Sequence, residues 1–171
     1  LVDQARARIA RRFEIARRYR FLKGSGLPLQ VPAIELVEIG AGGGSIARVD
    51  KLGRIAVGPD SAGSTPGPAC YGRGGTEPTV TDADVVLGRI DPEAFAGSKV
   101  RLDAASSARA LRDRSGRPLK LDRDHAAAGV AEIVGEGMAA AARVHCIESG
   151  QDAAARTVLV FGGEAPLHAA R

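Results

Sequence analysis

The chain has 171 residues, of which 44% are apolar and 26% are charged, a balance typical of a folded domain with its own core. It has no run of about 18 apolar residues, which excludes a membrane-spanning helix. Its two cysteines are too few for a disulfide framework or a four-thiolate zinc site. We expect Cys70 and Cys146 to be free thiols. Because tryptophan is absent and aromatic residues make up only 4% of the chain, aliphatic side chains must fill the core.

The first 23 residues are strongly basic, with a net charge of +6 where the whole chain carries +4. Apolar residues alternate with polar ones at Phe13 and Ile15 and again at Tyr19 and Phe21. This alternation favours strands with arginines on the solvated face. A helix over residues 3–18 is the competing interpretation, since Ala and Arg are good helix formers. Nucleic-acid binding by the basic tract is a further alternative.

Residues 32–57 are predicted to form three strands and a glycine loop. Residues 32–39 have the alternation of a strand, and a glycine-rich loop, 40–45, follows at once. Residues 46–50 and 54–57 are two short strands joined by a glycine-containing hairpin connection. Residues 58–80 are rich in glycine and proline and predict a long loop, either ordered and functional or a flexible linker.

The second half of the chain is mainly helical. A helix is expected from Thr81 to residue 90, with Thr81 as its N-cap and Asp84 completing a capping box. A second helix spans 104–112 and is closed by a turn at 115–118. The longest helix runs from about 124 to 149, with Gly150 after its end. A buried strand over 157–161 then leads through a glycine pair into a helix that begins near Pro166. Mixed helices and strands place the fold in the α/β or α+β class.

Two glycine loops are the candidate ligand-binding elements. In residues 40–45, successive glycines leave backbone N–H groups open to a phosphate. Gly162 and Gly163 lie between a strand and a helix N-terminus, a geometry suited to an anion or a nucleotide. Each loop alone is a weak signal, and a tight turn without a ligand explains the first equally well. Two such loops together fit a cleft that holds a nucleotide from two sides.

The titratable residues give weaker indications. His125, His145 and His168 have no metal-ligand spacing among themselves, and we expect His168 to be packed or solvated rather than to face a cleft. Asp82 and Asp84 are potential Mg²⁺ ligands, although helix capping is the simpler role for both. No catalytic constellation of Ser or Cys with His is readable from the spacing.

Four segments together resemble the hydantoinase A / 5-oxoprolinase family, which includes N-methylhydantoinase A and acetone carboxylase β-subunits. They are Gly40–Ala47, Ser61–Gly63, Gly67–Asp84 and Phe161–Gly163 with Pro166–Ala169. The resemblance implies an actin-like ATPase (ribonuclease H-like) fold, of which residues 1–171 would form one partial domain truncated at both ends. The basic first segment is usually extended in this family, which favours strands there.

The resemblance also implies cofactors, partners and site residues. ATP and Mg²⁺ would bind with Gly42, Gly43, Gly44 and Ser45 at the phosphates and with Gly162 and Gly163 near the nucleoside. A family member activates a cyclic amide or ketone carbonyl with ATP. It is cytoplasmic and usually needs a hydantoinase B-type subunit or domain. Neither nucleic acid nor a membrane is an expected partner.

Two departures from the family pattern bear on activity. The upstream Asp-x-Gly-Gly-Thr phosphate loop is missing, so we expect the isolated chain to be inactive. Glu164 and Ala165 stand where the family has Ala and Gly. Glu164 either caps the following helix or projects into the cleft and repels phosphates, and we favour repulsion. The favoured function is ATP-dependent ring opening of a cyclic amide. The alternatives are an ATP-dependent ketone carboxylase and a nucleic-acid-binding module.

Overall fold

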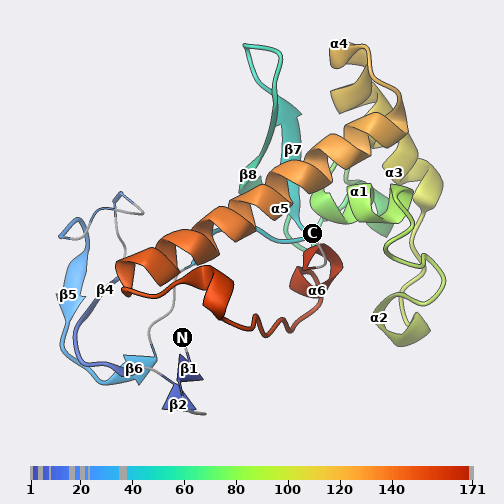
Figure 1. The fold of residues 1–171 in the computed structure, drawn as a ribbon. Coiled ribbons are helices and arrows are strands. Elements are labelled where there is room, and N and C mark those ends of the chain that lie inside the picture. Colours follow the sequence, from blue (N-terminus) through green and yellow to red (C-terminus); the bar gives the residue numbers. More distant parts are fainter. Residues whose placement is uncertain are drawn as a thin grey trace.

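The computed structural model describes residues 2–3, 6–7, 9–15, 18–19, 22, 24–34 and 38–169 (Figure 1). Its sheets are two-stranded and antiparallel, and its longest element is a 26-residue helix. The architecture is mixed α/β, as the sequence predicts. Among the described residues, no helix is both long enough and apolar enough to cross a membrane.

The N-terminal strands form three small pairs. Strand β1 (Val2–Asp3) pairs with β2 (Arg6–Ala7), β3 (Ile9–Ala10) with β6 (Ala33–Ile34), and β4 (Phe13–Ile15) with β5 (Leu27–Leu29). The strand interpretation is therefore confirmed for residues 9–10 and 13–15, and the helix over 3–18 is wrong there. Of the strand predicted at 32–39, only β6 is present among the described residues. Phe21 lies outside the described residues.

The predicted hairpin is confirmed as β7 (Ser45–Val49) and β8 (Ile55–Ser61). Asp50 shapes the connection, because its Oδ1 accepts hydrogen bonds from the backbone N–H groups of Leu52 and Arg54 at 2.8 and 2.9 Å. Strand β8 extends to Ser61 and so includes the first residues of the glycine- and proline-rich segment. The 3-10 helix η1 (Ala69–Tyr71) lies further along that segment.

Helix α1 (Val80–Val86) begins earlier than predicted. Its N-cap is Thr79 rather than Thr81, and its capping box pairs Thr79 with Asp82 rather than Thr81 with Asp84. The reason for this register is the set of tertiary contacts that Asp82 makes. Asp82 is fully buried, and besides the box it accepts hydrogen bonds from the N–H groups of Ala69 and Cys70 and from Ser107 Oγ.

The second predicted helix does not end in a turn. After α2 (Phe95–Ser98), helix α3 (Ala104–Leu111) continues through a π-helical segment, Arg112–Gly116, into α4 (Arg117–Leu119). Pro118 lies in the first positions of α4, directly after the π-helical segment. Gly116 is required by a close approach, since a Cβ there would lie 2.7 Å from the carbonyl oxygen of Leu121.

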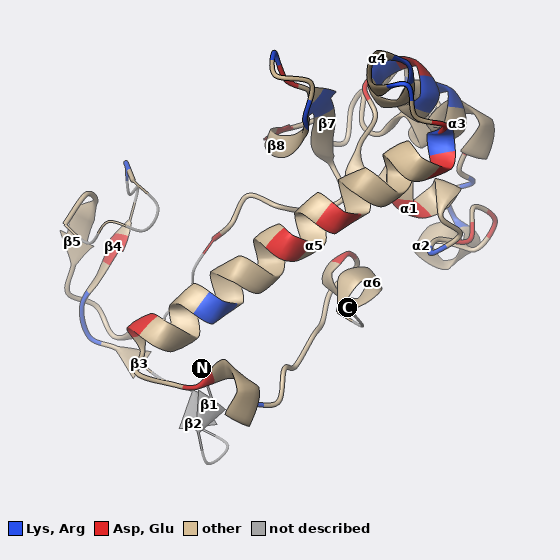
Figure 2. Cartoon of the chain, turned by 45° about the horizontal axis from the view of Figure 1, so that its top comes forward, with Lys and Arg blue, Asp and Glu red and all other residues tan. Residues whose placement is uncertain are grey.

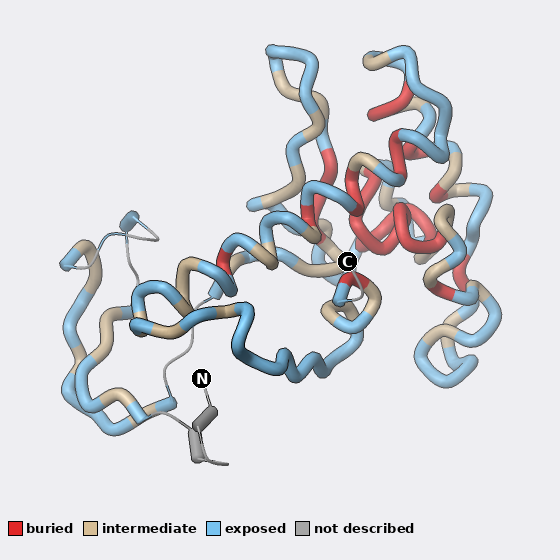
Figure 3. The backbone as a smooth tube through the Cα atoms, viewed as in Figure 1, coloured by how far each residue is buried: buried red, intermediate tan, exposed pale blue. Residues whose placement is uncertain are grey.

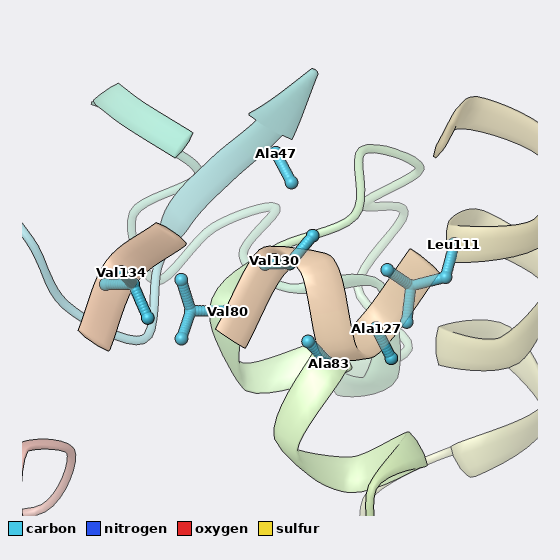
Figure 4. Packing of buried hydrophobic residues seen from close by; sticks show 7 residues of the cluster. All are labelled: Ala47, Val80, Ala83, Leu111, Ala127, Val130 and Val134. Atoms are coloured by element: carbon cyan, nitrogen blue, oxygen red, sulfur yellow. The ribbon is translucent and has the colours of Figure 1, made fainter. Parts of the chain in front are cut away.

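Helix α5 (Arg123–Glu148) carries the core, and its predicted length is confirmed. Its N-terminal half packs against α1, α3 and β7 around the seven residues shown in Figure 4: Ala47, Val80, Ala83, Leu111, Ala127, Val130 and Val134. Gly129 is closely packed against a side chain of β8, because a Cβ there would lie 2.8 Å from Ile55 Cδ1. Gly135 and Gly137 have no such neighbour.

Burial is concentrated at one end of the molecule (Figure 3). Helix α1, the start of α5 and strand β7 contribute about half of the buried residues, whereas the small N-terminal sheets lie near the other end of α5. Figure 2 shows Lys and Arg residues gathered around α3, α4 and the tip of the β7–β8 hairpin. Cys70 and Cys146 are free thiols, as expected.

The buried strand predicted at 157–161 is wrong. After the 3-10 helix η3 (Ala153–Ala155), these residues run as an irregular exposed segment, and Phe161 is 87% exposed. A strand needs a neighbour to pair its backbone, and no described strand lies beside this segment. The helix predicted near Pro166 is present as α6 (Ala165–His168).

Candidate functional site

A cleft of about 520 Å³ brings the two glycine loops together. Gly43 and Gly44 line it from the first loop and Gly163 from the second, whereas Gly42, Ser45 and Gly162 do not line it. The remaining lining residues come mainly from η1, α1, α2 and α6 and the segments beside them: Tyr71, Thr81, Arg89, Ile90, Asp91, Ala94, Phe95, Ala96, Glu164 and Leu167.

The first loop is a tight turn fixed from within. The N–H of Ser45 donates to the carbonyl oxygen of Gly42 at 2.9 Å, and the N–H of Gly42 donates to Ser45 Oγ at 3.1 Å. Ser45 is buried. Its hydroxyl therefore holds the turn together.

Gly43 lies where the loop meets both walls of the cleft. The N–H of Thr81 donates to the carbonyl oxygen of Gly43 at 2.9 Å, which ties the loop to α1. A Cβ on Gly43 would lie 2.5 Å from Thr81 Oγ1 and 2.7 Å from Glu164 Oε2. Both distances are well inside van der Waals contact, so any side chain at this position would displace one wall.

Glu164 does not cap α6. It occupies the N-cap position but makes no side-chain capping hydrogen bond, and its carboxyl group instead projects towards Gly43. Of the two alternatives drawn from the sequence, capping is wrong and projection into the cleft is correct. The second glycine loop therefore presents a titratable group to the first.

Behind Glu164 lies a buried network that joins α6 to α1. Arg89 Nη1 contacts Asp84 Oδ1 at 3.0 Å and His168 Nδ1 at 3.2 Å. Because a guanidinium only donates, His168 Nδ1 accepts and the ring proton lies on Nε2. His168 Nε2 then donates to Asp84 Oδ2 at 3.1 Å and to Glu164 Oε1 at 3.4 Å. His168 is packed, as expected.

Burial of Glu164, together with hydrogen bonding to Asp84 and repulsion by its carboxylate, raises the pKa of Glu164 to about 8. Arg89 opposes this shift. The physical reason is that two carboxyl groups in a partly desolvated space cannot both ionise easily. Glu164 is therefore mainly protonated near pH 7.

Local sequence patterns show little sign of this network, because Arg89 and His168 lie 79 positions apart along the chain. The one available signal is the four-residue spacing of Glu164 and His168, which places both on one face of a helical turn.

The Mg²⁺ that the family resemblance implies does not fit these residues. Asp82 is saturated by donors of the protein, including Thr79 Oγ1 at 2.8 Å. Ligand atoms of Asp84, Glu164 and His168 lie within 4.8 Å of one another. However, His168 Nε2 donates its proton to both carboxyl groups, and Mg²⁺ prefers an all-oxygen shell. The described cluster is a hydrogen-bonded network rather than a cation site.

An apolar wall completes the cleft. The rings of Tyr71 and Phe95 have centroids 6.0 Å apart and are tilted by 45°. Leu167 packs in the same cluster, together with buried Ile90. A ligand with an anionic end and a flat or apolar end would match the glycine loops on one side and these rings on the other.

Comparison with known proteins places the chain in a family. The family model described as Hydantoinase/oxoprolinase matches residues 5–171. The acetophenone carboxylase gamma subunit of Aromatoleum aromaticum is 45% identical over 143 residues, which are 83% of this chain and 20% of that protein. The caprolactamase subunit alpha of Pseudomonas jessenii is 42% identical over 141 residues, or 82% of this chain and 20% of that protein.

Solved structures agree. A nucleotide-free acetone carboxylase structure superposes with a TM-score of 0.76 at 33% identity, covering 83% of this chain and 20% of that one. The ATP-dependent caprolactamase from Pseudomonas jessenii superposes with a TM-score of 0.64 at 40% identity, covering 73% and 18%. The chain thus spans about a fifth of the length of these relatives. The chain belongs to the hydantoinase/oxoprolinase family.

Proposed function

We propose that these residues form one wall of the ATP site in an enzyme that activates a carbonyl group with ATP. The observation that carries the proposal is the convergence of Gly43, Gly44 and Gly163 on a single cleft. Backbone without Cβ atoms lets a phosphate approach closely. The solved relatives include an ATP-dependent caprolactamase. We infer that the complete enzyme has an actin-like ATPase fold, with this chain as part of one domain.

We propose a cyclic amide as the substrate, opened by hydrolysis after ATP activates its carbonyl. The named activity of caprolactamase, and that of Arabidopsis thaliana 5-oxoprolinase 1, at 32% identity over 161 residues, supports this class. An ATP-dependent ketone carboxylase is the second candidate, favoured by the 45% identity to an acetophenone carboxylase subunit. Since these relatives are named as subunits, we further propose a partner subunit or domain of the hydantoinase B type.

Each part of the cleft has its own role in the proposed function. The turn at Gly42–Ser45 would present its backbone to the phosphates, with Ser45 holding the turn from behind. Tyr71 and Phe95 would pack against the flat part of the ligand. The buried pair of Asp84 and His168 would keep α6, and with it Gly163, at its distance from the first loop.

The test is Gly43→Ala in the complete polypeptide that contains these residues. The added Cβ would meet Thr81 Oγ1 at 2.5 Å, so we expect ATP affinity measured by calorimetry to fall at least roughly tenfold. Gly135→Ala is the matched control, because a Cβ there has open space, and it should leave the affinity unchanged. Unaltered ATP affinity in a folded Gly43→Ala protein would refute the assignment of this loop.

The substrate class is tested separately. ATP hydrolysis by the complete enzyme with its partner subunit should be stimulated by lactams, hydantoins or 5-oxoproline. Stimulation only by ketones in the presence of bicarbonate would select the carboxylase instead.

A further inference from the structure

We propose that anion binding at the Gly43–Gly44 loop is linked to the protonation of Glu164: the cleft admits a phosphate-bearing ligand when this carboxyl group is neutral and repels it when it is ionised. This inference rests on the proposed ATP site but adds a regulatory residue that the glycine loops alone do not imply.

The carboxyl group of Glu164 lies beside Gly43 in the first glycine loop. Glu164 Oε2 lies 2.7 Å from the position that a Cβ on Gly43 would take. The side of Gly43 that carries no Cβ is thus occupied by Glu164 and Thr81, so a phosphate bound to this loop would lie next to the Glu164 carboxyl group. Two unit charges about 4 Å apart in a partly buried cleft interact strongly, because little water screens them. The charge of Glu164 thus has a direct effect on an anion at this loop.

The groups around Glu164 determine whether its carboxyl group is ionised. Four charged or titratable groups face Glu164: Asp84 from α1, Arg89 from the segment after α1, His168 from α6 and Tyr71 from η1. The Arg89 guanidinium is already engaged by Asp84 Oδ1 and His168 Nδ1. It therefore neutralises Asp84 first and leaves the second carboxyl group without a full counter-charge.

The consequence is a carboxyl group that titrates near physiological pH. Burial and the neighbouring Asp84 raise the pKa of Glu164 to about 8, so the group is mainly neutral at pH 7 and mainly ionised at pH 9. Binding of a phosphate-bearing ligand above pH 8 then requires uptake of one proton. The expected result is a dissociation constant that rises roughly tenfold between pH 7 and pH 9.

The experiment measures ATP affinity from pH 6.5 to 9.5 in the complete polypeptide, with Mg²⁺ and with a chelator. Inorganic tripolyphosphate serves as a second probe without a nucleoside. Glu164→Gln keeps the shape of the side chain and removes its titration, so its affinity should vary less than about twofold above pH 7. Glu136→Gln, on the exposed face of α5, is the matched control and should follow the unmodified protein.

The outcomes separate the two claims. Identical pH profiles for the unmodified protein and Glu164→Gln would refute the link between anion binding and Glu164 protonation, while the ATP site stands. Tripolyphosphate binding that weakens as the pH rises, without any ATP binding, would support this link and overturn the nucleotide assignment. An effect of Glu164→Gln seen only with Mg²⁺ present would make Glu164 a cation ligand and refute the link. If Glu164→Gln fails to fold, Glu164→Ala replaces it with the same expectation.

Discussion

Asp82 shows how one buried side chain can organise a loop that has little regular structure. Its two oxygens accept hydrogen bonds from the backbone of Ala69, Cys70 and Thr79 and from the hydroxyls of Thr79 and Ser107. The backbone around η1 is therefore fixed against α1 and α3. The same surroundings make Cys70 unreactive. Burial, with Asp82 nearby, raises the pKa of the Cys70 thiol to about 12. The thiol is therefore a packing residue and not a nucleophile.

Replacing Asp82 should therefore destabilise the protein severely. We expect Asp82→Ala to lower the free energy of unfolding by at least about 3 kcal/mol, because several buried donors lose their acceptor at once. Asp103→Ala is the matched control. Asp103 also accepts from the first turn of a helix, α3, but it is exposed, and its loss should cost about 1 kcal/mol. Equal losses in urea unfolding of the two variants would contradict the role given to Asp82.

The register of α1 illustrates what a sequence leaves open at this scale. Residues 79–84 contain two overlapping frames with a threonine three residues before an aspartate, at Thr79 and Asp82 and at Thr81 and Asp84. Both match a capping box. Only tertiary contacts separate them, because Asp82 must meet η1 and α3 while Asp84 must meet Arg89 and His168. The sequence predicts that a capped helix starts here, and the surrounding fold decides which residue starts it.

Helix α6 depends on its neighbours for stability. It has four residues, far too few for a helix to be stable alone. It is held by the hydrogen bond from His168 Nε2 to Asp84 Oδ2 at 3.1 Å and by packing of Leu167 beside Cys70 and Ile90. These contacts also fix the second glycine loop at the cleft.

Removal of the imidazole should release this element without unfolding the rest. We expect His168→Ala to increase amide hydrogen exchange over residues 163–169 by at least roughly tenfold, while exchange in α1 and α5 stays protected. His125→Ala, at the exposed start of α5, provides the comparison and should leave residues 163–169 unaffected. Exchange that stays slow in His168→Ala would show that packing alone holds α6.

Elements differed in how far local sequence determines them. Helix α5 and the β7–β8 hairpin are predicted well, because an apolar stripe, a capping aspartate and a glycine-containing turn are local signals. The convergence of the two glycine loops was also expected, although the structure alone places Gly43 opposite Glu164. The strand at 157–161 could not be judged locally, since its residue types favour a strand but pairing depends on a partner elsewhere.

At the scale of the whole molecule, apolar side chains divide into a small core and an exposed segment. The core lies where α1, α3, β7 and the start of α5 meet (Figures 3 and 4). Residues 157–161 lie apart from it, with Val158, Leu159 and Phe161 exposed by 75%, 77% and 87%. An apolar, β-prone, uncharged segment of this kind is typical of a surface that pairs with another strand, and when uncovered it promotes aggregation.

We therefore expect the 171-residue chain to bind apolar dyes and to scatter light on warming, and we expect the double variant Leu159→Lys with Phe161→Lys to do both less. The two lysines add charge to the exposed segment and touch no core residue, so the thermal transition should stay within about 2 °C. Val130→Ser tests the opposite case. Val130 is fully buried in the core, and a hydroxyl there should lower the thermal transition and increase dye binding. Dye fluorescence and scattering that are unchanged by the two lysines would show that another surface drives association.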